Sequence, residues 1–131
     1  MPHRAASSFV VDRRDETPVD LEGASLQRAR WTKKFSGDLA GTSVVEFIMG
    51  ELDGPAAAEK PKVYVGVERF DCTLGGRTGT FALVHTATML GADYQASWTI
   101  LPGSGTGALA GISGRAEITP DHDLILEYEL P

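Results

Sequence analysis

The sequence contains little cysteine and fewer basic than acidic side chains. The first feature limits its covalent cross-links, and the second limits its classes of partner. Cys72 is its single cysteine, which excludes an intrachain disulfide and indicates a reducing compartment. Lys and Arg number 12 against 18 Asp and Glu, which gives a net charge of −6. Nucleic acids and anionic membranes favour basic surfaces, so we expect neither as a partner. The basic stretch RARWTKK at 28–34 suits the solvent-facing side of a strand.

Long hydrophobic runs are also missing. The N-terminal stretch MPHRAASSFVV lacks the apolar segment of a signal peptide. No run approaches the roughly 18 apolar residues that a membrane-spanning helix needs. We therefore expect a cytoplasmic protein that has no membrane partner.

Metal and nucleotide motifs are absent as well. His3, His85 and His122 are scattered, and no short spacing of His and Cys suggests a metal site. The stretch PGSGTGALAGISG at 102–114 fits a loose dinucleotide-binding pattern, but Gly111 and Gly114 interrupt the helix that such a site requires. We expect no cofactor, and we interpret this stretch as a corner between strands.

The residues that are present follow a β pattern throughout. The segments KVYVGVERF (62–70) and TFALVHTATML (80–90) are rich in Val, Thr and aromatic residues and end at glycine turns. Residues 1–131 are expected to form a single domain in which 1–7 are a flexible tail. The predicted strands, with little or no helix between them, cover residues 8–13, 26–36, 43–51, 62–72, 79–90, 94–101, 114–120 and 123–130.

A repeat of 35 residues indicates how these strands are connected. Leu39, Leu74 and Leu109 each begin a Leu-x-Gly-x-Ser/Thr motif, and successive leucines are 35 residues apart. A period of this length with two strands per unit is a repeated hairpin, which places the three motifs at one end of the molecule. Closure into a barrel is the arrangement that leaves such strands without edges. The predicted fold is therefore an all-β, eight-stranded, antiparallel up-and-down barrel, similar to that of lipocalins.

Three ordered motifs resemble a bacterial family of unknown function: KFSGDLAGTS (34–43), YVGVERFDCTLGGRTGTFALVH (64–85) and the glycine-rich stretch at 102–114. The resemblance runs from Phe9 to Leu130 and implies a barrel like that of plant allene oxide cyclase. Self-association is common for that fold, so we expect a homo-oligomer. Where such sequences usually have a tryptophan at the end of the first strand this chain has Arg13 or Arg14, and Cys72 stands where they usually have a glycine.

Polar groups stand among aromatic ones on one face of two neighbouring strands. Alternation places Tyr64, Glu68 and Phe70 on one face, and Phe81 and His85 on one face of the next strand. Alternation leaves open whether that face points inward. If it does, Glu68 and His85 form the candidate catalytic pair, in which burial raises the pKa of Glu68 and the carboxylate raises that of His85. The side chains expected to contact a ligand are Tyr64, Phe70, Phe81, Tyr94, Trp98 and Glu46, the last as a second inward carboxylate.

Such a lumen indicates a protein that binds an apolar small molecule. A matched carboxylate and imidazole suit acid–base assistance of an isomerisation or cyclisation, and the resemblance to allene oxide cyclase points the same way. Two alternatives stay open: a carrier without turnover, and a structural barrel packed solid, because eight strands enclose little spare volume. The simpler interpretation is that Glu68 is an exposed residue or part of a structural ion pair, and that His85 is a core residue. Cys72 is not expected to act as a nucleophile, because the neighbouring Asp71 disfavours a thiolate.

Overall fold

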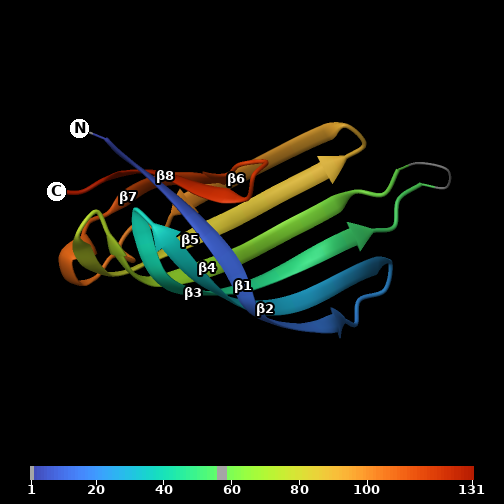
Figure 1. Cartoon of the computed structure of the whole chain (residues 1–131). Helices are drawn as coiled ribbons and strands as arrows, with labels where there is room; N and C mark the ends of the chain where they lie inside the picture. The colour runs from blue at the N-terminus through green and yellow to red at the C-terminus, as the bar shows by residue number, and fades with distance from the viewer. Residues whose placement is uncertain (1, 56–58) are drawn as a thin grey trace.

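The protein folds into a closed, antiparallel, up-and-down barrel of eight strands, which confirms the predicted fold class (Figure 1). The computed structural model describes residues 2–55 and 59–131. In chain order, the elements are β1 (His3–Val19), β2 (Ala24–Gly37), β3 (Leu39–Leu52), β4 (Lys62–Leu74), β5 (Arg77–Leu90), β6 (Asp93–Ile100), the short 3₁₀ turn η1 (Gly107–Leu109), β7 (Ser113–Ile118) and β8 (Asp123–Glu129). Within this described part of the chain, no helix is long and apolar enough to cross a membrane.

The first strand is longer than the sequence suggested. Residues 3–8 pair with β8, so the flexible tail expected over 1–7 is wrong from His3 onward, while Met1 lies outside the described residues. The physical reason is that β8 carries Leu124 and Leu126 into the core and needs a second partner to close the barrel. Ala5 supplies a small buried side chain opposite Leu126.

The three repeated motifs lie at one end of the barrel, as their spacing predicted. Leu39, Leu74 and Leu109 are completely buried in a single core cluster. The turns also touch directly, because the Gly75 N–H donates to the Asp38 carbonyl at 3.2 Å. Gly41 of the first motif has φ +146° and lies so close to β4 that a Cβ would meet the Asp71 carbonyl oxygen. This position therefore requires glycine.

The barrel is closed along only part of its length. Among the described residues, β6 and β7 share just two residue pairs, Trp98 with Ala116 and Thr99 with Arg115. Beyond Ser8, the pairs described for β1 are with β2 alone. We call the part that contains β7, β8 and the three turns the closed half. The rest, where the hairpins of β1–β6 extend past β7 and β8 in Figure 1, is the open half.

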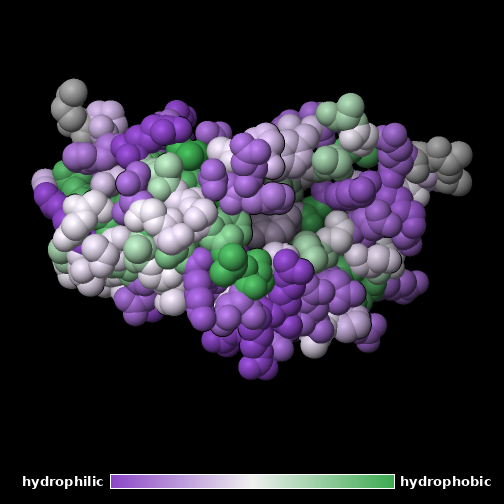
Figure 2. Space-filling model, in the orientation of Figure 1, coloured by the Kyte–Doolittle hydropathy of each residue, from purple (hydrophilic) through white to green (hydrophobic). Residues whose placement is uncertain are grey.

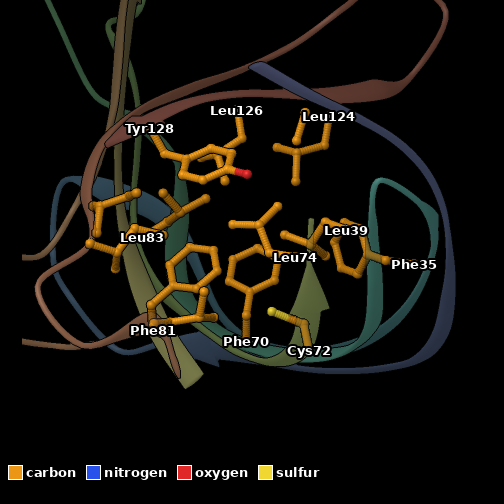
Figure 3. Close-up of a cluster of buried hydrophobic side chains, with 14 residues drawn as sticks. Phe35, Leu39, Phe70, Cys72, Leu74, Phe81, Leu83, Leu124, Leu126 and Tyr128 are labelled. Carbon is orange, nitrogen blue, oxygen red and sulfur yellow. The ribbon is translucent and has the colours of Figure 1, made fainter. Parts of the chain in front are cut away.

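The closed half is filled by large apolar side chains. Phe70 and Phe81 stack with their ring centroids 4.8 Å apart, and Phe35 lies 5.2 Å from Phe70. Figure 3 shows these rings pointing toward Leu126 and Tyr128 from the opposite wall. Ring stacking of this kind adds to the free energy gained from burial. Phe70 and Phe81, which the sequence suggested as ligand contacts, therefore occupy this core.

Candidate functional site

The face that alternation left undecided points into the barrel. On β4, Glu68 and Phe70 are buried and Tyr64 is half-buried, whereas Val65 and Val67 are exposed. On β5, Phe81 and His85 are buried in the same way. The predicted pair, Glu68 and His85, therefore meets inside the barrel.

A continuous row of rings crosses the inner wall, with one ring from each of the strands β2–β6. The rings of this aromatic belt are Trp31, Phe47, Tyr64, His85 and Trp98. Neighbouring centroids are 4.9, 5.0, 6.0 and 4.9 Å apart in that order. The belt exists because each of these residues occupies an inward position of its strand, so that rings on adjacent strands come into contact.

Next to the belt lies a buried polar cluster of Lys33, Ser43, Glu68 and His85, again with one residue from each of four adjacent strands. The Ser43 hydroxyl donates to Glu68 Oε2 at 2.5 Å. Lys33 Nζ lies 3.3 Å from Oε2 and 3.4 Å from Oε1. His85 Nε2 lies 2.9 Å from Oε1. The Glu68 carboxylate is thus the shared acceptor of the cluster.

The cluster sets the charge of Glu68. Burial by itself raises the pKa of this carboxyl, but the His85 contact, the Lys33 charge and the Ser43 hydroxyl outweigh burial and hold the pKa below its usual value of 4.5. The expected raised pKa of Glu68 is therefore wrong, because the expectation included burial but not the three side chains that contact the carboxylate. Glu68 is ionised, and it orients His85 rather than supplying a proton.

Three polar atoms in and beside this cluster have no hydrogen-bond partner among the described residues. They are His85 Nδ1, His85 Nε2 and Trp98 Nε1, and all three are inaccessible to solvent. His85 Nε2 is close to Glu68, although its N–H direction is not aligned for a linear hydrogen bond. A carboxylate only accepts, so the imidazole tautomer that suits Glu68 has its proton on Nε2, and in that tautomer Nδ1 offers a lone pair. Trp98 Nε1 can only donate.

A pocket of about 250 Å³ opens where β6 and β7 separate, and Trp98 forms part of its wall. Its other lining residues are Tyr94, Ala96, Ser97, Ala116, Glu117 and Ile118. Tyr94 is 57% exposed in the part of β6 that pairs with β5 but not with β7. Figure 2 shows a hollow near the middle of the face that it presents, with both hydrophilic and hydrophobic residues along its border. The pocket therefore reaches the aromatic belt from the side of the barrel.

The family of the chain is shown by comparison with known sequences. The profile of a family described as a protein of unknown function, DUF3224, matches residues 5–131. The chain belongs to the DUF3224 family. The suggested membership of a bacterial family of unknown function is thereby confirmed. No curated protein matches the chain.

One solved DUF3224 structure has the same fold. It is the crystal structure of a DUF3224 family protein of unknown function from Shewanella oneidensis MR-1, with a TM-score of 0.82 and 23% sequence identity. The match covers 100% of this chain and 99% of the other. At this identity, the likeness shows the fold of the DUF3224 barrel and nothing about its site.

The predicted ligand-contacting residues of this DUF3224 chain lie in four different places. Tyr94 and Trp98 line the side pocket, and Tyr64 lies between Phe47 and His85 in the aromatic belt. Phe70 and Phe81 belong to the core of the closed half. Glu46 is wrong as an inward carboxylate: it is exposed on the outer face and lies 3.4 Å from Arg30.

Lys33 and Ser43 were not predicted as site residues. The solvent-facing interpretation of RARWTKK holds for Arg28, Arg30 and Lys34 but is wrong for Lys33, which is only 9% exposed. The strand alternation contained the necessary signal, since Lys33 shares its face with Ala29, Trp31 and Phe35. Burial of a lysine on that face requires an acid opposite it, and Glu68 meets this requirement.

Two further side chains keep their protons. Burial raises the pKa of the Cys72 thiol to about 11, with a smaller contribution from Asp71, so this cysteine is a poor nucleophile, as expected. Burial and then Glu68 raise the pKa of Tyr64 far above its usual value, so its hydroxyl is neutral. Among the residues that the structure describes, no three His, Cys, Asp or Glu side chains come together as metal ligands.

Proposed function

We propose that this DUF3224 barrel binds a small, largely apolar molecule in its open half, beside His85 and Trp98. The observation that carries the proposal is the set of three buried, unpartnered polar atoms on His85 and Trp98, of which Trp98 lines a pocket. A buried polar atom without a partner costs about 1–3 kcal/mol, so proteins rarely retain several neighbouring ones without a use for them. Apolar walls with a few polar groups are the usual composition of a small-molecule site.

The polar cluster suits assistance of an isomerisation or a cyclisation. His85 Nδ1 would take a proton from the carbon next to a carbonyl, the C–H electrons would form the enolate double bond, and the proton would return to another carbon. The imidazolium formed in between would be paired with ionised Glu68. A carrier without turnover uses the same site with no proton transfer. An enzyme and a carrier are distinguished by hydrogen exchange in D₂O. An enzyme should make a carbonyl compound exchange its α-protons for deuterium faster than the same compound does without protein, and a carrier should not.

Ligand binding is tested by thermal unfolding in the presence of apolar carbonyl compounds and unsaturated fatty-acid derivatives. A ligand at one hundred times its Kd adds about 2.7 kcal/mol, which raises the Tm of a domain this size by several degrees. Ala96→Trp should abolish the shift, because it fills the pocket from an exposed position. Ala40→Trp is the matched control, on the exposed side of β3. Absence of any shift, or an equal shift in Ala96→Trp, would contradict the proposed site.

We also propose that the barrel self-associates through the outer face of β4. Val65 and Val67 are 44% and 48% exposed at the centre of this face. Exposed apolar patches of this kind mark interaction surfaces. Glu46 lies beside Val67 and Arg69 is two residues further along β4, so a second copy related by a two-fold axis can place opposite charges together.

Self-association is checked by light scattering coupled to size-exclusion chromatography. Wild type should elute with a mass that is a multiple of the 14.0 kDa chain, and Val67→Glu should shift it toward the monomer. Val10→Glu, at a still more exposed valine on β1, should leave the mass unchanged. A monomeric wild-type protein would refute this interface.

A further inference from the structure

We infer that the ligand of the open half carries a hydroxyl group that bridges His85 Nδ1 and Trp98 Nε1. This inference rests on the proposed function and adds the chemical class of the ligand: a phenol, an alcohol or an enol on an otherwise apolar body.

The inference follows from what the two atoms can do. Nε2 of His85 lies 2.9 Å from Glu68 Oε1, and the tautomer with its proton on Nε2, facing this acceptor, leaves Nδ1 as an acceptor. The indole N–H of Trp98 is a donor. The two rings are neighbours, with centroids 4.9 Å apart. One ligand group satisfies both atoms only if it donates one hydrogen bond and accepts another. A hydroxyl does this, whereas an ether or ketone oxygen only accepts and an ammonium group only donates.

The other tryptophan provides a comparison within the same barrel. Trp31 Nε1 donates to Glu16 at 3.2 Å, and the Arg14 guanidinium lies 4.6 Å from the centre of the Trp31 ring. The chain thus satisfies one of its two indole N–H groups with its own carboxylate. The N–H of Trp98 has no such partner among the described residues and borders the pocket instead.

The surroundings of Trp98 specify the rest of the ligand. The pocket walls along β6 and β7 carry Tyr94, Ala96, Ala116 and Ile118, which offer aromatic and apolar contacts, together with the polar Ser97 and Glu117. A planar apolar body can pack against these groups while its hydroxyl points toward the aromatic belt. The route inward lies between β6 and β7, which just two residue pairs connect in the described structure.

The test uses 4-propylphenol and its methyl ether, 4-propylanisole, which differ by the hydroxyl hydrogen and one methyl group. Both are titrated into ¹⁵N-labelled wild-type protein, and the two indole N–H signals are followed by NMR, with Trp31→Phe used for assignment. The phenol should move the Trp98 signal downfield and bind roughly five- to tenfold more tightly than the ether, which is the usual effect of one net hydrogen bond. Trp98→Phe keeps a ring but removes the donor, so the preference should fall below about twofold. Trp31→Phe should retain it.

Each outcome decides a separate point. Equal affinities for the phenol and the ether would overturn the hydroxyl inference and leave the proposed site intact. No response of the Trp98 signal to either compound would overturn both. A phenol preference that survives in Trp98→Phe would also overturn the inference. If that variant does not fold, the wild-type spectra decide: a downfield shift with the phenol alone supports the bridge, and equal shifts with both compounds contradict it.

Discussion

Glu68→Gln is expected to lower the free energy of unfolding by about 3–5 kcal/mol, the usual loss when one partner of a buried ion pair is removed. The carboxylate is 2% exposed and is the shared acceptor of the polar cluster. Its replacement leaves the Lys33 ammonium buried without a counter-charge. Urea denaturation followed by circular dichroism measures the effect.

Glu46→Gln is the matched control, because this glutamate lies on the adjacent strand and makes an exposed ion pair with Arg30. Exposed pairs contribute about 0–1 kcal/mol, so the control should remain close to wild type. Adding Lys33→Met to Glu68→Gln should restore part of the lost stability, since the unpaired charge is removed as well. A loss below about 1 kcal/mol in Glu68→Gln, or no recovery in the double variant, would show that the cluster is not a coupled ion pair.

The pH dependence of the same variant gives a second check. The pKa of Glu68 is lower in the folded state than its ordinary value of 4.5. Its ionisation therefore contributes stability that is present above the unfolded pKa and is lost as the pH falls through the folded pKa. The difference in stability between wild type and Glu68→Gln should accordingly shrink as the pH falls below 4.5. A difference that stays constant in acid would contradict this account.

Phe70→Ala should cost about 3–5 kcal/mol, the range for truncating a large core side chain. Phe70 is completely buried and contacts Phe35 and Phe81, both of which come from other strands. The closed half cannot easily collapse around the resulting cavity, because hydrogen-bonded strands fix its walls. Urea denaturation again measures the change, and Asp71→Ala, at the next and outward position of β4, is the control. A loss below about 1.5 kcal/mol would mean that the core repacks.

The fold could be predicted because its determinants are local in the sequence. The repeated leucine motifs and the strands between them set the meander, and closure followed from the need to cover the strand edges. The open half could not be predicted in the same way. It arises because β7 and β8 are short relative to the other strands, which leaves β6 with two partners on β7. The paired length of each strand depends on its register with its neighbours. Neither the composition nor the turn motifs of the sequence specify that register.

The candidate site was predicted in part. Glu68 and His85 lie on neighbouring strands and alternate with exposed valines and threonines, so their shared face was visible. Glu46 stands in the continuous apolar run SVVEFIMG, where alternation cannot tell inside from outside. Lys33 is 35 residues away from Glu68 in sequence. Its effect on the pKa of Glu68 depends on a contact that spans the intervening strand β3, so it could not be included before the strand pairing was known.

Joining β1 to β8 has a consequence for the order in which the protein folds. Six residue pairs, from His3–Tyr128 to Ser8–Asp123, connect the two ends of the chain. Every other strand pair is a hairpin or a short connection, which forms with a small loss of chain entropy. During synthesis, the barrel can close only after its last strand has left the ribosome, and until then β1 and the growing sheet have exposed edges. We therefore expect the nascent barrel to be most vulnerable to wrong pairing while the hairpin of β7 and β8 has yet to find β1.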